Sequence, residues 1–350
     1  MEKKRLIIFT TSYYPFVGGA EIAVQEAGRR LADQFKIYIV TGRFSRKLPK
    51  RETRPEGEII RVGMGSRFDK WLLPFWGCVI GLRRIKKGQT ILWGMDIGQG
   101  SGAALLCKML VRRCPFVLTI EYGYGDARLA RGRFGAIGLA LRWMLSRADE
   151  VTVISSYLGD VAAAYGYRGS CAIIHNGVDA GLFGADERQN PSLLKQSSQK
   201  KNPEVPVIIT VSRLVEKNGV DLLIRAIGIV KKKIGSVQCQ ILGDGPERPH
   251  LEKLAKDLSL QDDIQFLGNV PYEKLPAFLH KATIFVRLSR SEGMGNSFVE
   301  ALAAGLPVIG TPVGGILDII EDEKTGFFAR PDDPDDAADK ILRLLRDPSL

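Results

Sequence analysis

Two glutamates flank a glycine-rich turn in the second half of the chain, and their spacing points to binding chemistry. Glu292 and Glu300 stand eight residues apart in SEGMGNSFVEALAAG. A helix that begins near Ser297 would direct both carboxylates toward one pocket and its first amides toward an anion. Carboxylates accept hydrogen bonds, so they suit the hydroxyls of a sugar or a ribose. The structural alternative is a capping box, because Ser297-x-x-Glu300 also fits that pattern.

Two cations stand in a second loop, in the segment TVSRLVEKNGVDLLIRA. Arg213 and Lys217 follow an apolar run and precede a helical pattern. They could clamp a diphosphate there, Arg as a planar fork and Lys as a point charge. Two solvated surface cations would explain the same spacing.

Glycines mark further loops. Gly18 and Gly19, in TTSYYPFVGGAE, precede a helical pattern whose first amides could approach a phosphate, with a flexible turn as the alternative. The segments GDGPER and GMGNSF come close to G-x-G-x-x-G, but Arg248 and Phe298 stand where the third glycine is required. A nicotinamide dehydrogenase is therefore disfavoured. The glycines of GDGPER are expected to form a tight turn between a strand and a helix.

Short apolar runs alternate with helical patterns along the whole chain, which predicts βαβ units. The runs cover residues 6–10, 36–41, 59–62, 89–93, 116–120, 150–154 and 171–174, then 207–211, 237–242, 264–266, 283–286 and 307–310. We therefore expect an α/β protein with two doubly wound, Rossmann-like domains facing a cleft. Such sheets bind ligands at the carboxyl ends of their strands, where the loops above lie.

A polar segment, 186–206, interrupts the alternation and is the expected linker. It would separate a first domain, 1–185, from a second domain, 207–350. A length of 350 residues fits two domains.

Composition excludes several classes of protein. The chain is 45% hydrophobic and 25% charged, which is ordinary globular usage and argues against a disordered or collagen-like chain. The apolar run 71–82 is too short for a membrane span of about 20 residues, and the first residues do not read as a signal peptide. Five cysteines without a C-x-x-C pair favour a reducing cytoplasm over a disulfide framework or a zinc site.

Positive charge is concentrated in the first half. The net charge is +11, and residues 1–180 carry 28 Lys and Arg against 15 Asp and Glu. This excess indicates an anionic partner. Segment 67–88 combines aromatic residues with a basic end, which is typical of peripheral contact with an anionic membrane face; a buried helix with a charged end is the alternative. Nucleic acid is disfavoured, because no recognition motif accompanies the charge.

Taken in order, these pieces resemble the retaining glycosyltransferases of family four, the "group 1" set with the GT-B architecture. The resemblance spans essentially the whole chain. Its carriers are PFVGGAE, ADEVTVISSYLGD, HNGVD, SRLVEKNGVDLLIRA, ILGDGPER, FLGNVPYEKL, SEGMGNSFVEALAAGLPVIGTPVGG and TGFF.

The resemblance implies a role for each matching position. Gly18 and Gly19 would line the phosphate side from the first domain, and Arg213 and Lys217 would neutralise the donor diphosphate. Glu300 would bind the nucleotide ribose and Glu292 the hydroxyls of the donor sugar. The backbone of Gly295, Asn296 and Ser297 would cover sugar and phosphates, with Val270 near the base.

Two departures from the family pattern stand out. Relatives often have a His after the fifth strand of the first domain, where LTIEYGYGD places Glu121. Either Glu121 takes over its positioning role, or the acceptor side works differently. The chain also ends at LLRDPSL, before the family's usual final crossing helix.

The resemblance implies a metal-independent, retaining hexosyltransferase without a cofactor. It would use a UDP- or GDP-linked sugar as donor and a glycan or lipid-linked acceptor, in polysaccharide or glycolipid biosynthesis. We expect it in the cytoplasm, with peripheral membrane contact at the inner face as the hypothesis from segment 67–88. The alternatives are a nucleotide-sugar epimerase of GT-B fold and a non-catalytic nucleotide-sugar-binding protein.

Overall fold

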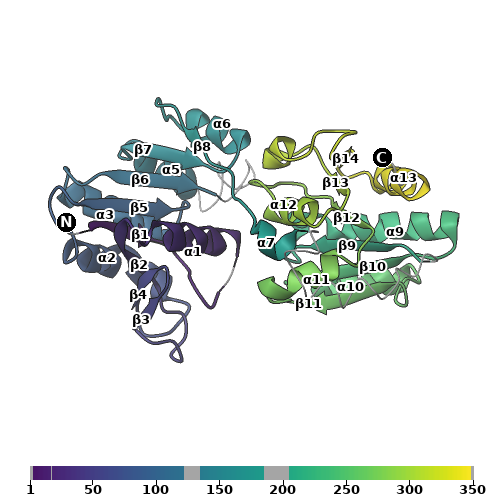
Figure 1. The fold of residues 1–350 in the computed structure, drawn as a ribbon, viewed down its shortest axis with the longest axis horizontal. Coiled ribbons are helices and arrows are strands. Elements are labelled where there is room, and N and C mark those ends of the chain that lie inside the picture. The colour runs from purple at the N-terminus through teal and green to yellow at the C-terminus, as the bar shows by residue number, and fades with distance from the viewer. Residues whose placement is uncertain (1–2, 17, 122–134, 185–204, 348–350) are drawn as a thin grey trace. The chain divides into compact units, whose positions relative to one another are not determined.

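The computed structural model describes residues 3–16, 18–121, 135–184 and 205–347. The chain divides into two compact units, Met1–Asn176 and Gly177–Leu350. Each unit is an α/β domain with its own sheet (Figure 1).

The sheet of the first unit has eight strands in the order β3-β4-β2-β1-β5-β6-β7-β8. All neighbouring strands run parallel except the β3–β4 pair, which is antiparallel. The described elements are β1 (Lys4–Phe9), α1 (Gly19–Leu31), β2 (Phe35–Gly42), β3 (Arg51–Arg54), β4 (Gly57–Val62), α2 (Asp69–Leu82), β5 (Thr90–Met95), α3 (Gln99–Leu110), β6 (Phe116–Ile120), α5 (Ala136–Leu145), β7 (Glu150–Val153), α6 (Ser156–Ala164) and β8 (Ala172–Ile173).

The sheet of the second unit has six parallel strands in the order β11-β10-β9-β12-β13-β14. The described elements are α7 (Ala180–Phe183), β9 (Val207–Val211), η1 (Glu216–Asn218), α9 (Val220–Ile234), β10 (Gln238–Leu242), α10 (Arg248–Asp257), β11 (Ile264–Gly268), η2 (Tyr272–Lys274), α11 (Leu275–Leu279), β12 (Ile284–Arg287), α12 (Asn296–Ala303), β13 (Val308–Gly310), η3 (Gly314–Asp318), β14 (Gly326–Phe328) and α13 (Pro334–Arg346). The strand order reverses between β9 and β12, and the loops after these two strands flank the switch point, where doubly wound sheets bind their ligands.

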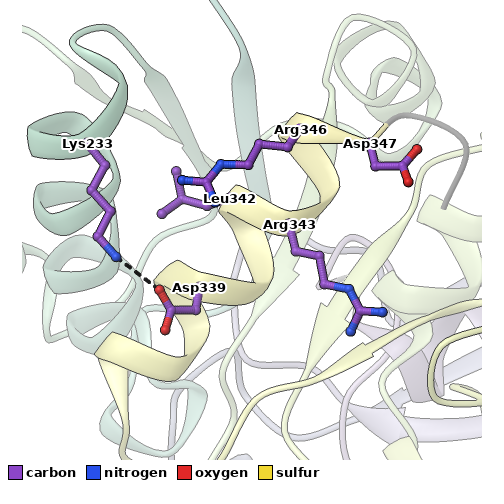
Figure 2. A pocket seen from close by; sticks show the side chains of 6 residues that line it. All are labelled: Lys233, Asp339, Leu342, Arg343, Arg346 and Asp347. Atoms are coloured by element: carbon purple, nitrogen blue, oxygen red, sulfur yellow. Dashed lines mark hydrogen bonds and ion pairs between the residues drawn. The ribbon is translucent and has the colours of Figure 1, made fainter.

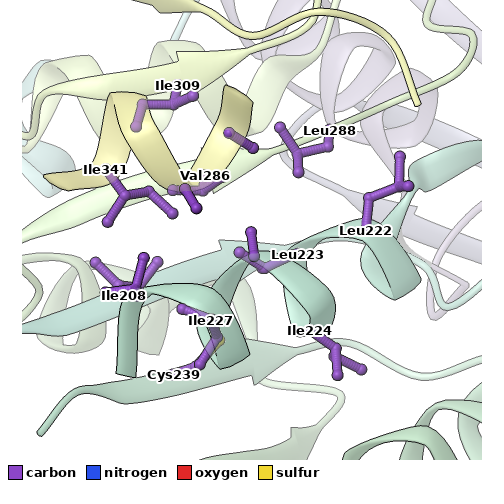
Figure 3. Close-up of a cluster of buried hydrophobic side chains, with 14 of the residues drawn as sticks. Ile208, Leu222, Leu223, Ile224, Ile227, Cys239, Val286, Leu288, Ile309 and Ile341 are labelled. Atoms are coloured by element: carbon purple, nitrogen blue, oxygen red, sulfur yellow. The ribbon is translucent and has the colours of Figure 1, made fainter. Parts of the chain in front are cut away.

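Apolar side chains pack on both faces of this second sheet. On one face, residues from α9 and α13 close over the strands (Figure 3): Leu223 and Ile227 from α9 and Ile341 from α13 are buried with Ile208 of β9. A separate cluster, which includes Phe298 of α12 and Phe183 of α7, covers other strand residues of the same sheet. Strands that are buried on both faces are apolar along their whole length, and this is why apolar runs in the sequence predicted these strands.

The predicted α/β alternation is confirmed in both units. Two strands were not predicted from the sequence: β3, which is the polar tetrapeptide RETR, and the three-residue strand β14. The segment between 177 and 184 belongs to the second unit, and Phe183 is buried in a core cluster there. The domain limits at 185 and 207 stay predictions, because most of the expected linker lies outside the described residues.

Candidate functional site

The loops after β9 and β12 are packed against each other at the switch point. Gly219 adopts a left-handed conformation (φ +61°), and a Cβ atom there would lie 1.8 Å from the carbonyl oxygen of Leu288. The Arg290 N–H donates to the Lys217 carbonyl oxygen at 2.7 Å. Only glycine permits this close approach, so the two loops form one surface.

Arg287, the last residue of β12, lies at the centre of that surface. It was not among the site residues predicted from the sequence. Its Nη1 donates to Ser297 Oγ at 3.0 Å, and its Nη2 donates to Asn218 Oδ1 at 3.2 Å. The same Nη2 forms an ion pair with Glu292 Oε2. The side chains of Arg287 and Glu292 are only 11% and 13% exposed, so this ion pair is largely shielded from solvent.

Glu292 is held in place from several sides. Besides Arg287, the N–H of Gly293 donates to its Oε1 at 3.1 Å. Its backbone is packed just as closely: a Cβ atom on Gly314, which has φ +54°, would lie 1.9 Å from the Glu292 carbonyl oxygen. The carboxylate therefore has a defined orientation within the polar cluster at the switch point.

Glu300 lies on α12 and is 9% exposed. Burial raises the pKa of its carboxyl to about 7, although the nearby Arg287 charge lowers it. None of the described residues donates a hydrogen bond to this carboxyl. The capping-box alternative is wrong, because α12 begins at Asn296 with Gly295 as its N-cap and has no side-chain cap. Ser297 Oγ instead accepts from Arg287.

The two expected diphosphate ligands stand on the loop after β9. Arg213 is exposed, and within the described ranges no acidic side chain pairs with it. Lys217 lies in the short helical turn η1, next to Asn218. Asn218 Nδ2 donates to the Arg213 carbonyl oxygen at 2.7 Å, which links the turn to the Arg287 cluster. The backbone at both cations is thus fixed, while the Arg213 side chain remains accessible.

The loop after β10 serves packing. Gly243 has φ +125°, and a Cβ atom on it would lie 1.9 Å from the Ser212 carbonyl oxygen; one on Gly245 would lie 2.3 Å from that of Leu214. The expectation of a tight turn is confirmed. Val270 follows β11 at the edge of the sheet and packs against the core cluster that contains Phe298.

In the first unit, Gly18 is the N-cap of α1 and Gly19 its first residue. The Glu21 carboxylate folds back onto this turn: it accepts a hydrogen bond from Ser12 Oγ at 2.5 Å, and a Cβ atom on Gly18 would lie 2.8 Å from its Oε2. Burial raises the pKa of Glu21. A carboxylate of the chain itself therefore lies beside the turn whose amides were expected to face a phosphate.

Glu121 follows β6 and is 8% exposed. Burial, together with the charge of Asp96, raises its pKa to about 8, against the lowering effect of a hydrogen bond with Asn176. The Glu21 charge acts in the same direction as that of Asp96. Carboxylates from the first turn of α1 and from the ends of β5 and β6 thus share one edge of the sheet.

Helix α2 turns its large apolar residues outward. Its buried face consists of Asp69, Leu73, Gly77, Cys78 and Gly81, and the two glycines allow close packing on α3. The exposed residues at and after its start are Phe68, Trp71, Phe75, Trp76 and Val79. Their exposed fractions reach 69% for Phe75, so the predicted alternative of a simply buried helix is wrong. Within the described ranges, no helix combines the length and apolarity needed to cross a bilayer.

A hollow elsewhere in the second unit, of about 550 Å³, lies beside the ends of α9 and α13. Figure 2 shows its charged lining, with Lys233 Nζ bound to Asp339 Oδ1 at 3.1 Å. None of the predicted site residues lines it, so it does not compete with the switch-point site.

Comparison with known proteins gives the family. Residues 194–350 match "Glycosyl transferases group 1", and residues 17–182 match "Glycosyltransferase Family 4". The gpi3 subunit of phosphatidylinositol N-acetylglucosaminyltransferase from Schizosaccharomyces pombe is 34% identical over 349 residues, covering 96% of this chain and 71% of that protein.

A GDP-mannose-dependent alpha-(1-6)-phosphatidylinositol monomannoside mannosyltransferase from Mycobacterium tuberculosis is 33% identical over 235 residues. The match covers 65% of this chain, and the chain spans only 58% of the length of that relative. Among solved structures, sucrose-phosphate synthase from Thermosynechococcus elongatus superposes with a TM-score of 0.83 at 21% identity, covering 99% of this chain and 91% of that one. This likeness shows the fold. The chain belongs to the family-four, group 1 glycosyltransferases and has their GT-B fold.

Proposed function

We propose that the chain transfers a sugar from a nucleoside-diphosphate sugar to an acceptor, with retention of the anomeric configuration and without a metal ion. The observation that carries the proposal is the polar cluster at the switch point, in which Glu292 and Ser297 converge on Arg287. Lys217 and Arg213 stand on the adjoining loop. Doubly wound sheets bind nucleotides at this position.

The residues have complementary roles in this proposal. The carboxylates of Glu292 and Glu300 accept hydrogen bonds from hydroxyls of the donor sugar and of the ribose. Arg213, Lys217 and the first amides of α12 face the diphosphate. Val270 stands near the base. A phosphate contact of Gly18 and Gly19 stays a prediction from the sequence, because the Glu21 carboxylate lies against their turn.

The charges of these groups suit a metal-independent departure of the diphosphate. As the bond between the sugar C1 and the phosphate oxygen breaks, its electron pair stays on that oxygen. The positive charges of Arg213 and Lys217 stabilise the negative charge that develops. The acceptor oxygen forms the new bond to C1 on the same face, and its proton passes to the departing phosphate.

Glu121 is proposed to position the acceptor hydroxyl. With its pKa raised to about 8, its carboxyl is largely protonated at neutral pH and can donate a hydrogen bond. This would replace the family's usual His at that place.

We further propose a lipid-linked acceptor reached from an anionic membrane surface. Both relatives described above have names that specify phosphatidylinositol or a mannoside of it. The exposed aromatic residues of α2 are accompanied by basic side chains at Arg67, Lys70, Arg83, Lys86 and Lys87. This combination suits the boundary between anionic headgroups and acyl chains.

A donor screen tests the proposal. Thermal shift and calorimetry with UDP, GDP, ADP and CMP, and with their common sugar conjugates, should reveal one preferred nucleotide and, as its sugar conjugate, the preferred donor. That donor should then be hydrolysed or transferred, and Glu292→Ala should abolish turnover while Lys232→Ala, on the exposed end of α9, leaves it intact. Binding without turnover would favour the non-catalytic alternative, and epimerised donor would favour the epimerase. Binding of none of these probes would refute the proposal.

A further inference from the structure

Arg287 contacts neither donor nor acceptor in the transfer described above, although the polar cluster of the switch point converges on it. It is the only residue in the described part of the chain whose side chain contacts Glu292, Asn218 and Ser297 together. We propose that Arg287 is a positioning residue, which holds the Glu292 carboxylate in the orientation that binds the hydroxyls of the donor sugar. The inference rests on the proposed function.

The hydrogen bonds of Glu292 leave it able to bind a ligand. Arg287 engages Oε2, and the N–H of Gly293 engages Oε1. A carboxylate has about four lone-pair sites on its two oxygens. Each oxygen therefore keeps an acceptor site after its protein contact is made. The orientation of the carboxylate is fixed, and its remaining acceptors suit hydroxyl donors.

The shape of the guanidinium explains why an arginine stands here. Its two terminal nitrogens reach three acceptors from separate segments: the turn η1, the loop after β12 and the start of α12. Asn218 is itself oriented, because its Nδ2 donates to the Arg213 carbonyl oxygen. Arg287 thus links the sugar-binding carboxylate to the loop with the diphosphate cations. A lysine, a single point charge, cannot present this fork.

A purely structural role makes a different prediction. A buried ion pair whose cation is lost destabilises the fold and would weaken every ligand of the site to a similar extent. A positioning role instead weakens the sugar contact selectively. The ratio of the affinities for a nucleotide sugar and for its free diphosphate separates the two, because the diphosphate lacks the sugar that Glu292 would bind.

The experiment measures that ratio by calorimetry, with GDP and GDP-mannose and with UDP and UDP-N-acetylglucosamine. Arg287→Met and Arg287→Lys should each lower the affinity for the sugar nucleotide about tenfold more than for the diphosphate, the scale of a charged hydrogen bond. Arg343→Met is the matched control, since Arg343 lies on α13 and forms an exposed ion pair with Glu323. Arg287→Lys keeps the charge beside Glu292, so it provides the answer if the methionine variant does not fold.

A double-mutant cycle tests whether Arg287 acts through Glu292. Once Glu292 is replaced by Gln, adding Arg287→Met should change the affinity ratio little further. The effects of the two substitutions on this ratio should therefore not be additive. Additive effects, or an unchanged ratio in Arg287→Lys, would overturn the inference while leaving the proposed function intact. If the unmodified protein prefers another nucleotide of the donor screen, the ratio is measured with that nucleotide and its sugar conjugate. If it binds none of them, the proposed function and this inference fail together.

Discussion

Arg290 binds both carboxylate oxygens of Asp221, with hydrogen bonds of 2.9 and 2.8 Å, and thereby ties the loop after β12 to the first turn of α9. The backbone N–H of the same residue holds the Lys217 carbonyl oxygen. Bidentate pairs of this kind are directional and stronger than single ion pairs. The pair therefore supports the site without being part of its ligand-binding surface.

Asp221→Asn should destabilise the protein by about 1.5–3 kcal/mol at pH 7, the range for hydrogen bonds to charged groups. Burial raises the pKa of Asp221, but the hydrogen bonds and charge of Arg290 outweigh it and leave that pKa below its ordinary value. The stabilisation by the Asp221–Arg290 pair is therefore present above the unfolded-state pKa of Asp221 and is lost as the pH falls through its folded-state pKa. Urea unfolding at pH 7 and pH 3 measures this. Asp339→Asn, at an exposed pair, should change little; equal losses in both variants would contradict the prediction.

Lys217→Ala should weaken binding of the preferred nucleoside diphosphate by about 1.5–3 kcal/mol, because a charged hydrogen bond to phosphate is lost. Arg213→Ala should have an effect of similar size. Calorimetry at constant ionic strength measures both, with Lys232→Ala as the control for a change of surface charge. An unchanged affinity in either site variant would remove that residue from the diphosphate site.

The ionisation of Glu300 should make nucleotide binding depend on pH. Burial raises its pKa to about 7, so the carboxyl gains its second acceptor oxygen only as the pH rises through that value. Affinity for the diphosphate should therefore increase from pH 6 to pH 8 more in the unmodified protein than in Glu300→Gln. The difference between the two curves isolates Glu300 from the titration of the ligand. Parallel curves would show that the ribose is bound elsewhere.

Glu121 should lower the stability of the fold at alkaline pH. Its pKa of about 8 lies above the ordinary value because of burial and the Asp96 charge. A carboxyl group whose pKa is raised by folding contributes stability that is fully present below its unfolded-state pKa. That stability is lost as the pH rises through its folded-state pKa. Glu121→Gln should therefore gain in relative stability between pH 5 and pH 9, as measured by urea unfolding. The same pH dependence in both proteins would argue against a buried, titrating carboxyl.

The outer face of α2 should bind anionic vesicles. The protein should float with vesicles of phosphatidylcholine and phosphatidylserine but much less with phosphatidylcholine alone, since each nearby Lys or Arg contributes about 1 kcal/mol. Phe75→Ala with Trp76→Ala should reduce flotation several-fold, because two exposed aromatic residues are lost. Leu317→Ala, an exposed apolar residue of the second unit, is the control. Flotation that depends on neither lipid charge nor the aromatic pair would end the membrane proposal.

The sequence by itself determined the alternation of strands and helices and the loops that carry the candidate residues. Strands buried on both faces must be apolar along their length, so runs such as 207–211 and 116–120 were visible without a structure. The turn at GDGPER could also be predicted from the local sequence. A positive φ and a close approach to a neighbouring backbone carbonyl both require glycine. The polar strand β3 carries no such pattern, and its pairing with β4 is a tertiary contact.

Only the tertiary structure decided how the candidate residues are partnered. Arg287 stands at the end of an apolar strand, and nothing local distinguishes it from a surface cation. Of its acceptors, Glu292 and Ser297 follow in the next loop and helix, whereas Asn218 comes from a segment 69 residues away in the chain. The outward aromatic face of α2 likewise depends on its small residues packing against α3. Burial depends on how strands and helices pack together, and it raises the pKa of Glu300. The orientation of Glu292 depends on how the loop after β12 folds back on Arg287.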